Sequence, residues 1–211
     1  MGLIALAFLS PWVCLAEGPP EERGDFGEPD LVELVKIDPL LRLDIRYATT
    51  NNFIGRAVYR EPRAFLQRPA AEALRRVHKA LREKGFGLVI YDAYRPWSVV
   101  KIFWDETPMR HKQFVADPGR GSGHSRGCAV DLTLCDAKTG KPAAMPGAYD
   151  EWSERSAIGY GGGTKESRRL RDLLRDEMES EGFFRCELEW WHYTWKDAGE
   201  YQNLDIPFSK L

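Results

Sequence analysis

Two segments of the chain carry side chains that could hold a metal ion. In SGHSRGCAVDLTL (residues 122–134), His124 lies in a glycine-containing turn and Asp131 follows among apolar neighbours. An ionised carboxylate in apolar surroundings needs a cation or strong hydrogen-bond donors, because burial alone raises its pKa until it is neutral. Taken alone, the segment fits metal ligation and equally a structural pair between Asp131 and Arg126.

The second segment, EWWH, places Glu189 three residues before His192, with two tryptophans between them. A catalytic zinc site has three protein ligands and one open position, and His124, Asp131 and His192 would leave that position to water. Bound zinc lowers the pKa of water to about 7, so Glu189, or Glu187 as the fallback, could take its proton. On a regular strand Glu189 and His192 would point to opposite faces, so we expect a bulge or turn between them. The alternative is an aromatic core strand with a hydrogen-bonded histidine.

An arginine follows the hydrophobic run that ends in DAYRP (residues 92–96). Arg95 is permanently cationic and offers several donors, so it could stabilise an oxyanion at the edge of a cleft. An ion pair with Asp92 is the structural alternative. His78 has no acid at ligand spacing and His111 lies in a polar segment, so we expect no direct role for either.

The elements that must position these residues follow from apolar patterning and from helix start and stop signals. Helices are predicted for residues 68–84, with Pro69 in the first turn and Gly85 as the stop, for 98–104, and for 165–181 after an N-cap at Thr164. Strands are predicted at 31–35, 41–47, 87–94, 128–134 and 183–195. The fold class expected is α+β, a single domain with a mainly antiparallel central sheet flanked by helices and the metal site in a cleft on the sheet.

Composition limits the number of domains and the classes of partner. The 211 residues are 43% hydrophobic and 29% charged, which suits one domain with a full core. A net charge of -2 gives no reason to expect nucleic acid or an anionic membrane as a partner. The oligomeric state stays open.

The N-terminus is typical of export. Residues 1–16 are uncharged and apolar, which predicts a signal peptide cleaved after Ala16 and an exported, periplasmic or secreted protein. The run is too short to span a membrane and Pro11 interrupts it; a frayed helix of a cytosolic protein is the alternative. Residues 17–30 are predicted to be a flexible lead-in, and 31–211 the domain itself.

Three cysteines remain after such cleavage. Cys128 and Cys135 lie too far apart along one strand to bridge, so Cys135 with Cys186 is the only pair worth testing as a disulfide. There is no CxxC motif, which leaves a thiolate zinc site without support.

Taken together, the motifs resemble those of the VanX-type D-Ala-D-Ala dipeptidases, relatives of the zinc DD-carboxypeptidases. The resemblance runs from about residue 31 to 198. It rests on SGHSRGCAVDLTL, EWWH and DAYRP, together with LDIRYATTNNFIGRAVY at 43–59 and YDEWSERS at 149–156.

The resemblance implies a function and a role for each matching residue. The chain would hydrolyse the D-Ala-D-Ala dipeptide, a small peptidoglycan-derived substrate, with one Zn²⁺ ion per chain. The implied metal ligands are His124, Asp131 and His192. Glu189 would be the base and Arg95 would stabilise the transition state. Asp150 would hold the free ammonium of the substrate, and Ser122 would line the cleft.

Two departures from the family pattern concern the shape of the pocket. The loop before Tyr149 reads MPGA, and Ala157-Ile158-Gly159 replaces a histidine often found after the SERS segment. Two other functions therefore stay open: a zinc carboxypeptidase or endopeptidase acting on longer peptidoglycan stems, and a non-catalytic zinc or cell-wall binding module. The presence of Glu189 and Arg95 argues against the binding module, because binding alone needs neither residue.

Overall fold

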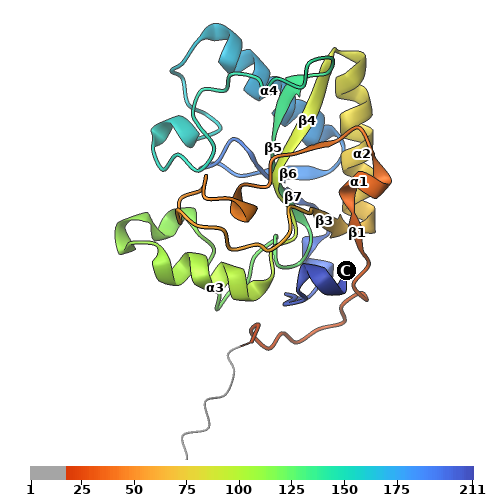
Figure 1. Cartoon of the computed structure of the whole chain (residues 1–211), viewed down its shortest axis with the longest axis vertical. Coiled ribbons are helices and arrows are strands. Elements are labelled where there is room, and N and C mark those ends of the chain that lie inside the picture. The colour runs from red at the N-terminus through yellow and green to blue at the C-terminus, as the bar shows by residue number, and fades with distance from the viewer. Residues whose placement is uncertain (1–17) are drawn as a thin grey trace, which may run out of the picture.

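The computed structural model describes residues 18–211, so the predicted signal peptide, residues 1–16, lies outside the described residues. The predicted α+β class is confirmed. A central five-stranded sheet has the order β2-β4-β5-β7-β6, and β1 and β3 form a separate two-stranded sheet (Figure 1). The strands are β1 Leu31–Glu33, β2 Arg42–Leu43, β3 Phe65–Gln67, β4 Phe86–Asp92, β5 Ala129–Asp136, β6 Phe183–Arg185 and β7 His192–Trp195. The helices are α1 Leu34–Ile37, α2 Arg68–Glu83, α3 Trp97–Glu106 and α4 Lys165–Ser180, with short 3-10 turns at Arg46–Ala48, Met109–Phe114, Glu154–Ser156, Ala198–Glu200 and Phe208–Lys210.

The central sheet is mainly antiparallel, and its register brings distant residues together. Only β2 runs parallel to its neighbour β4; β4, β5, β7 and β6 pair antiparallel. Asp131 on β5 lies opposite His192 on β7 and, on its other side, opposite Asp92 of β4, just after an irregularity in that ladder. Strand pairing alone therefore places three polar side chains in one row across the sheet.

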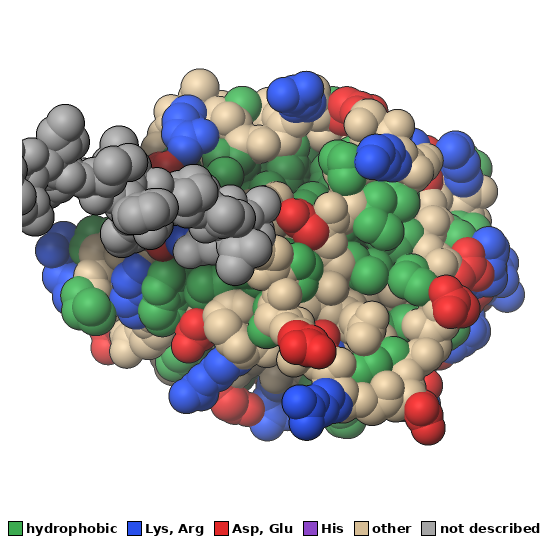
Figure 2. All heavy atoms as spheres, turned by 90° about the horizontal axis from the view of Figure 1, so that it is seen from below, with side chains coloured by type: hydrophobic (Ala, Val, Ile, Leu, Met, Phe, Trp, Pro, Cys, Tyr) green, Lys and Arg blue, Asp and Glu red, His purple; other side chains and the backbone are tan. Residues whose placement is uncertain are grey.

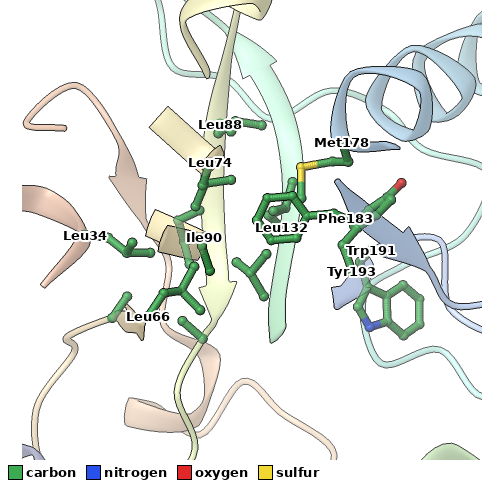
Figure 3. Close-up of a cluster of buried hydrophobic side chains, with 14 of the residues drawn as sticks. Leu34, Leu66, Leu74, Leu88, Ile90, Leu132, Met178, Phe183, Trp191 and Tyr193 are labelled. Carbon is green, nitrogen blue, oxygen red and sulfur yellow. The ribbon is translucent and has the colours of Figure 1, made fainter. Parts of the chain in front are cut away.

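One face of the sheet is covered by α2 and α4, which form the hydrophobic core with it (Figure 1). Leu132 on β5 and Ile90 on β4 point into this core, where they meet Leu74 of α2 and Met178 of α4 (Figure 3). Side chains alternate along a strand, so Asp131 points to the opposite face. That face is not covered by the two long helices and carries the polar residues.

The long helices begin where the sequence predicts and end one residue before the predicted positions. α2 has Pro69 in its first turn and is followed by Gly85 at φ +85°, a backbone conformation that glycine adopts without strain. At the start of α4 the side chain of Thr164 accepts a hydrogen bond from the backbone N–H of Ser167. The short helix predicted at 98–104 is α3.

Two strand predictions near the N-terminus are partly wrong. The strand expected at 31–35 stops at Glu33 and α1 begins, with the N–H of Leu34 bonded to the carbonyl of Ala64. The strand expected at 41–47 is reduced to Arg42–Leu43 and gives way to a 3-10 turn at Arg46–Ala48. The carbonyl of Tyr47 accepts bonds from the N–H groups of Val58 and Tyr59. Tertiary hydrogen bonds thus override local β propensity here.

The region before the domain contacts it in several places. The backbone N–H of Gly27 donates to the carbonyl of Glu200 at 2.8 Å, and the carboxylate of Glu22 pairs with Arg126 and accepts from the N–H of Asn203. Gly18 to Asp30 contain no helix or strand. The flexibility expected for this lead-in stays a prediction. Arg126, however, is engaged by Glu22 and is not the partner of Asp131.

The surface carries a hydrophobic patch and a groove. Figure 2 shows a face on which hydrophobic side chains gather between charged ones. A groove of about 760 Å³ is lined by α3 and the C-terminal residues around Phe208.

Among residues 18–211 no helix has the length and apolar character needed to cross a bilayer. Within the same range Cys128, Cys135 and Cys186 are all free thiols, so the structure contains no Cys135–Cys186 disulfide.

Candidate active site

His124, Asp131 and His192 converge on the open face of the sheet. One ligand atom from each lies within 4.8 Å of the others. Nε2 of His124 is 3.1 Å from Nδ1 of His192, and Oδ1 of Asp131 is 3.0 Å from Nδ1 of His192 and 3.4 Å from Nε2 of His124. The structure therefore brings together the three residues that the sequence singled out as ligands.

The turn that presents His124 depends on Gly127. The N–H of Gly127 donates to the carbonyl of His124 at 3.0 Å, which closes the turn before β5. Gly127 has φ +68°, and a Cβ there would lie 2.4 Å from a methyl carbon of Leu31. A side chain at this position would strain the backbone and force the Leu31 side chain to move, so the turn favours glycine.

Each histidine is oriented through its other ring nitrogen. Nδ1 of His124 lies 2.7 Å from the carbonyl oxygen of Ala93. A carbonyl oxygen only accepts, so Nδ1 carries the proton and Nε2 presents a lone pair to the cluster. Nε2 of His192 lies 3.1 Å from the hydroxyl of Thr194, which leaves Nδ1 facing Asp131.

Glu189 lies beside the cluster because a turn separates it from β7. The N–H of His192 donates to the carbonyl of Glu189 at 3.2 Å, and the two tryptophans between them are buried. The predicted turn is thus present, and it places Oε2 of Glu189 4.0 Å from Nδ1 of His192. Burial raises the pKa of Glu189 to about 7, an effect that His192 only partly opposes. Glu187, the fallback base, is exposed and pairs with Arg185.

Arg95 is held in the site by a buried ion pair. Its Nε donates to Oδ2 of Asp92 at 2.8 Å, and Tyr59 donates to the other oxygen of Asp92 at 2.8 Å. Nη2 of Arg95 also lies 3.6 Å from Oδ2 of Asp131. The two interpretations of Arg95 are therefore compatible, since the ion pair with Asp92 fixes the guanidinium that faces the cluster.

Asp150 reaches the same cavity from the loop after β5. Both of its carboxylate oxygens lie 3.2 Å from the hydroxyl of Tyr47. Burial raises the pKa of Asp150 well above its usual range, and the nearby charges of Asp131 and Glu189 raise it further. No described cation pairs with this carboxylate, so it is suited to receive one from a ligand.

The electrostatics of Asp131 are opposite to those of Asp150. Burial would raise the pKa of Asp131, but His124 and His192 outweigh it and hold the pKa well below its usual range. Asp131 is therefore ionised, as a metal ligand must be.

A small cavity of about 70 Å³ joins these groups, and Ser122 lies in its wall. The hydroxyl of Ser122 accepts a hydrogen bond from the N–H of His124 at 3.1 Å. The outer wall is an aromatic rim formed by Phe53, Phe114 and Trp152, in which the rings of Phe114 and Trp152 are stacked with centroids 6.1 Å apart.

The sequence did not single out several residues that shape the site. Tyr47, Tyr149 and the aromatic rim all lie in segments outside the ligand motifs. Tyr47 and Tyr149 belong to the LDIRYATT and YDEWSERS stretches, which carried the resemblance but gave no role to either hydroxyl. His78 is buried away from the cavity and bonds to Asp38 at 2.7 Å, and His111 packs on Trp152.

Comparison with known proteins agrees with this geometry. A sequence model of the M15 peptidase family, described as D-Ala-D-Ala dipeptidase, matches residues 28–210. The chain belongs to this family. It is 37% identical over 180 residues to the D-alanyl-D-alanine dipeptidase of Escherichia coli K12, a match that covers 85% of this chain and 92% of the relative. It is 35% identical over 189 residues to the D-alanyl-D-alanine dipeptidase of Enterococcus faecium, covering 80% and 92%.

Similarity to solved structures is weaker. The LdcB LD-carboxypeptidase has a TM-score of 0.43 and 23% identity, over 64% of this chain and 62% of that chain. The family assignment therefore rests on the sequence matches. The family predicted from the motifs is confirmed, and with it a metallopeptidase of the zinc-dependent M15 class.

Proposed function

We propose that the chain hydrolyses the D-Ala-D-Ala dipeptide with one Zn²⁺ ion held by His124, Asp131 and His192, and with Glu189 as the base. The observation that carries the proposal is the convergence of these ligand atoms within 4.8 Å of one another beside a buried carboxylate. Family membership and the names of the relatives support the substrate.

The donor set fits a divalent cation. Nε2 of His124 presents a lone pair, and Oδ1 of Asp131 is an ionised acceptor only 3.4 Å away. Two acceptors at this distance repel each other unless a cation lies between them. Two imidazole nitrogens and one carboxylate are typical of catalytic zinc, which keeps a further position open. At this site zinc would polarise the scissile carbonyl and lower the pKa of the attacking water to about 7.

Glu189 then moves the proton. Its carboxylate faces the ligands at 4.0 Å from His192, and burial has raised its pKa to about 7. A base whose pKa lies near the working pH both accepts a proton and returns it efficiently. Glu189 takes the proton from water during attack and delivers it to the leaving amine.

Arg95 stabilises the negative charge that develops on the carbonyl oxygen. The ion pair with Asp92 holds its guanidinium in place before substrate arrives, so little reorganisation is needed during reaction. Its side chain is 9% exposed, which keeps competing water away and strengthens the interaction.

Asp150 selects the free ammonium of a dipeptide. Its carboxylate lies in the wall of the cavity and lacks a cationic partner among the described residues. A longer peptide would place an uncharged amide at this point and leave the acid unpaired, which costs about 1–3 kcal/mol. Ser122 supplies a hydroxyl on the same wall for a polar group of the substrate.

Metal analysis combined with a substrate panel tests the proposal. The purified protein is expected to contain one zinc per chain and to release D-Ala from D-Ala-D-Ala; chelation should abolish the activity and added zinc should restore it. Faster cleavage of a pentapeptide stem than of the dipeptide would favour the carboxypeptidase alternative. Peptide binding without turnover in the zinc-loaded protein would favour the binding module.

Export to the periplasm or the exterior is part of the proposal. It is supported by the uncharged apolar run of residues 1–16 and the small residues before Glu17. Peptidoglycan fragments occur outside the cytoplasm, where such an enzyme would meet its substrate. N-terminal sequencing of the protein from fractionated cells should find mature chains that begin at Glu17; chains that retain Met1 in the cytosol would refute export.

A further inference from the structure

Tyr149 contacts Asp131, one of the three residues proposed to hold the metal ion, through the carboxylate oxygen that does not face the histidines. Its hydroxyl lies 3.0 Å from Oδ2 of Asp131 and 3.3 Å from the hydroxyl of Tyr47. Its ring packs against Tyr91 at 4.5 Å and against Trp191 at 5.3 Å between centroids. The hydroxyl is therefore aimed at Asp131 by a ring that its neighbours hold in place.

The two oxygens of Asp131 have different surroundings. Oδ1 faces His192 at 3.0 Å and His124 at 3.4 Å. Oδ2 faces the hydroxyl of Tyr149 at 3.0 Å and the guanidinium of Arg95 at 3.6 Å. A carboxylate without such contacts can turn about its last bond and exchange its oxygens, so donors on Oδ2 decide which oxygen meets the cation.

We propose that Tyr149 is a positioning residue for the metal. By donating to Oδ2 it holds the Asp131 carboxylate in one rotation, with Oδ1 directed toward the histidines as a one-oxygen ligand. The inference rests on the proposed function in one respect, because it takes Asp131 as a ligand of the bound cation. Partners in the outer shell of a metal site set the orientation and basicity of the ligand in this manner.

An unusual backbone conformation makes the contact possible. Asp150 has φ +58° and is the one described non-glycine residue with a positive φ. Aspartate tolerates this region better than most residues do. In extended chain, neighbouring side chains point to opposite sides, whereas here Tyr149 and Asp150 both approach the hydroxyl of Tyr47. The turn thus presents an outer support of the metal ligand and a substrate-binding acid from adjacent residues.

Tyr149→Phe removes the hydroxyl and keeps the ring packing. Tyr91→Phe is the matched control, because Tyr91 is also buried, packs on the ring of Tyr149 and has the guanidinium of Arg46 over its own ring, and no contact between its hydroxyl and Asp131 is seen. Tyr91 does not line the cavity. Any effect of ring packing alone should appear in both variants, and an effect of the hydroxyl on Asp131 only in the first.

The experiment measures the affinity for Zn²⁺ of metal-stripped full chain against a competing chelator. Tyr149→Phe is expected to bind zinc about 10- to 100-fold more weakly than the parent, and Tyr91→Phe as tightly as the parent. With Co²⁺ in place of zinc, the visible absorption bands of Tyr149→Phe should shift because the carboxylate changes its coordination. The melting temperature of the metal-free protein should be the same in parent and variants.

Each outcome separates this inference from the proposed function. A parent chain that binds no zinc refutes the proposed function. A parent that binds zinc, with Tyr149→Phe equal to it in affinity and Co²⁺ spectrum, overturns the inference alone. Equal losses in both variants also overturn it, since they assign the effect to the stacked rings.

Discussion

The acid Glu33 and the two acids of the cavity, Asp150 and Glu189, have opposite electrostatic surroundings. Glu33, which does not line the cavity, accepts from Nε and Nη2 of Arg63 at 2.9 and 3.0 Å and pairs with Lys36 at 3.0 Å. The hydrogen bond from Arg63 lowers the pKa of Glu33 to about 2. In the cavity, burial raises the pKa of Glu189 to about 7 and moves that of Asp150 in the same direction.

The difference shows where each group finds its counter-charge. At Glu33 the chain itself supplies the cations, so ionisation stabilises the fold. At Asp150 and Glu189 the chain supplies too little positive charge, so ionisation costs stability until a ligand compensates. Strained electrostatics of this kind are typical of sites that bind or react.

The largest effect is expected from Glu189→Gln. The amide keeps the shape of the side chain but cannot take a proton, so kcat should fall about 10²- to 10⁴-fold with zinc content unchanged. Steady-state hydrolysis of D-Ala-D-Ala measures this, and Glu187→Gln, an exposed neighbour, should leave kcat unaltered. Equal rates for parent and Glu189→Gln would remove Glu189 as the base.

Arg95→Lys should have the next largest effect. Lysine keeps the charge but loses the planar fork that spans Asp92 and the cavity, so kcat should fall about 10²- to 10³-fold. Arg63→Lys is the matched change at Glu33, outside the cavity. This variant should have a lower free energy of unfolding but the same kcat as the parent. If both variants lost a comparable part of kcat, Arg95 would act through stability.

Asp150→Asn should raise KM for the dipeptide by about 10- to 100-fold, since a bond between charged groups is worth roughly 1.5–3 kcal/mol. The same substitution should raise the melting temperature of the metal-free protein at pH 7. A carboxyl group whose pKa is raised in the folded chain destabilises the fold as the pH rises, because it must ionise in an unfavourable site. Asparagine cannot ionise, so the variant avoids this cost. Unchanged KM would show that the ammonium binds elsewhere.

The smallest effect concerns Glu33→Gln. The hydrogen bond from Arg63 lowers the pKa of Glu33 in the folded chain to about 2 from its ordinary value of 4.5. Its contribution to stability is therefore present above pH 4.5 and is lost as the pH falls toward 2. At pH 7 the variant should lose roughly 1–2 kcal/mol after allowance for partial exposure, and near pH 2 the loss should vanish. Denaturant unfolding at both pH values measures the difference.

Local chemistry made the centre of the site predictable. Asp131 among apolar residues and His192 among tryptophans are costly placements that packing alone does not explain. The turn between Glu189 and His192 followed from strand geometry, and the structure contains it. Pairing of β5 with β7 then brings Asp131 and His192 together, which single-strand patterns cannot specify.

What could not be predicted depends on contacts between distant segments. The 3-10 turn that carries Tyr47 replaces an expected strand because its carbonyl accepts bonds from Val58 and Tyr59. The contact between Tyr149 and Asp131 needs the positive φ of Asp150 and the close approach of two loops. In the sequence, the tyrosines that supply these hydroxyl groups cannot be told from tyrosines that only pack in the core.

The placement of the three proposed ligand residues has a consequence for the integrity of the chain. His124 lies in the turn before β5, Asp131 on β5 and His192 on β7, close to the C-terminal end. An ion shared by them would act as a reversible cross-link between segments far apart in sequence. Binding at a thousandfold excess over Kd adds about 4 kcal/mol to the free energy of unfolding. The zinc-loaded chain should thus resist proteases that cut the metal-free one, so catalysis and longevity would fail together when metal is scarce.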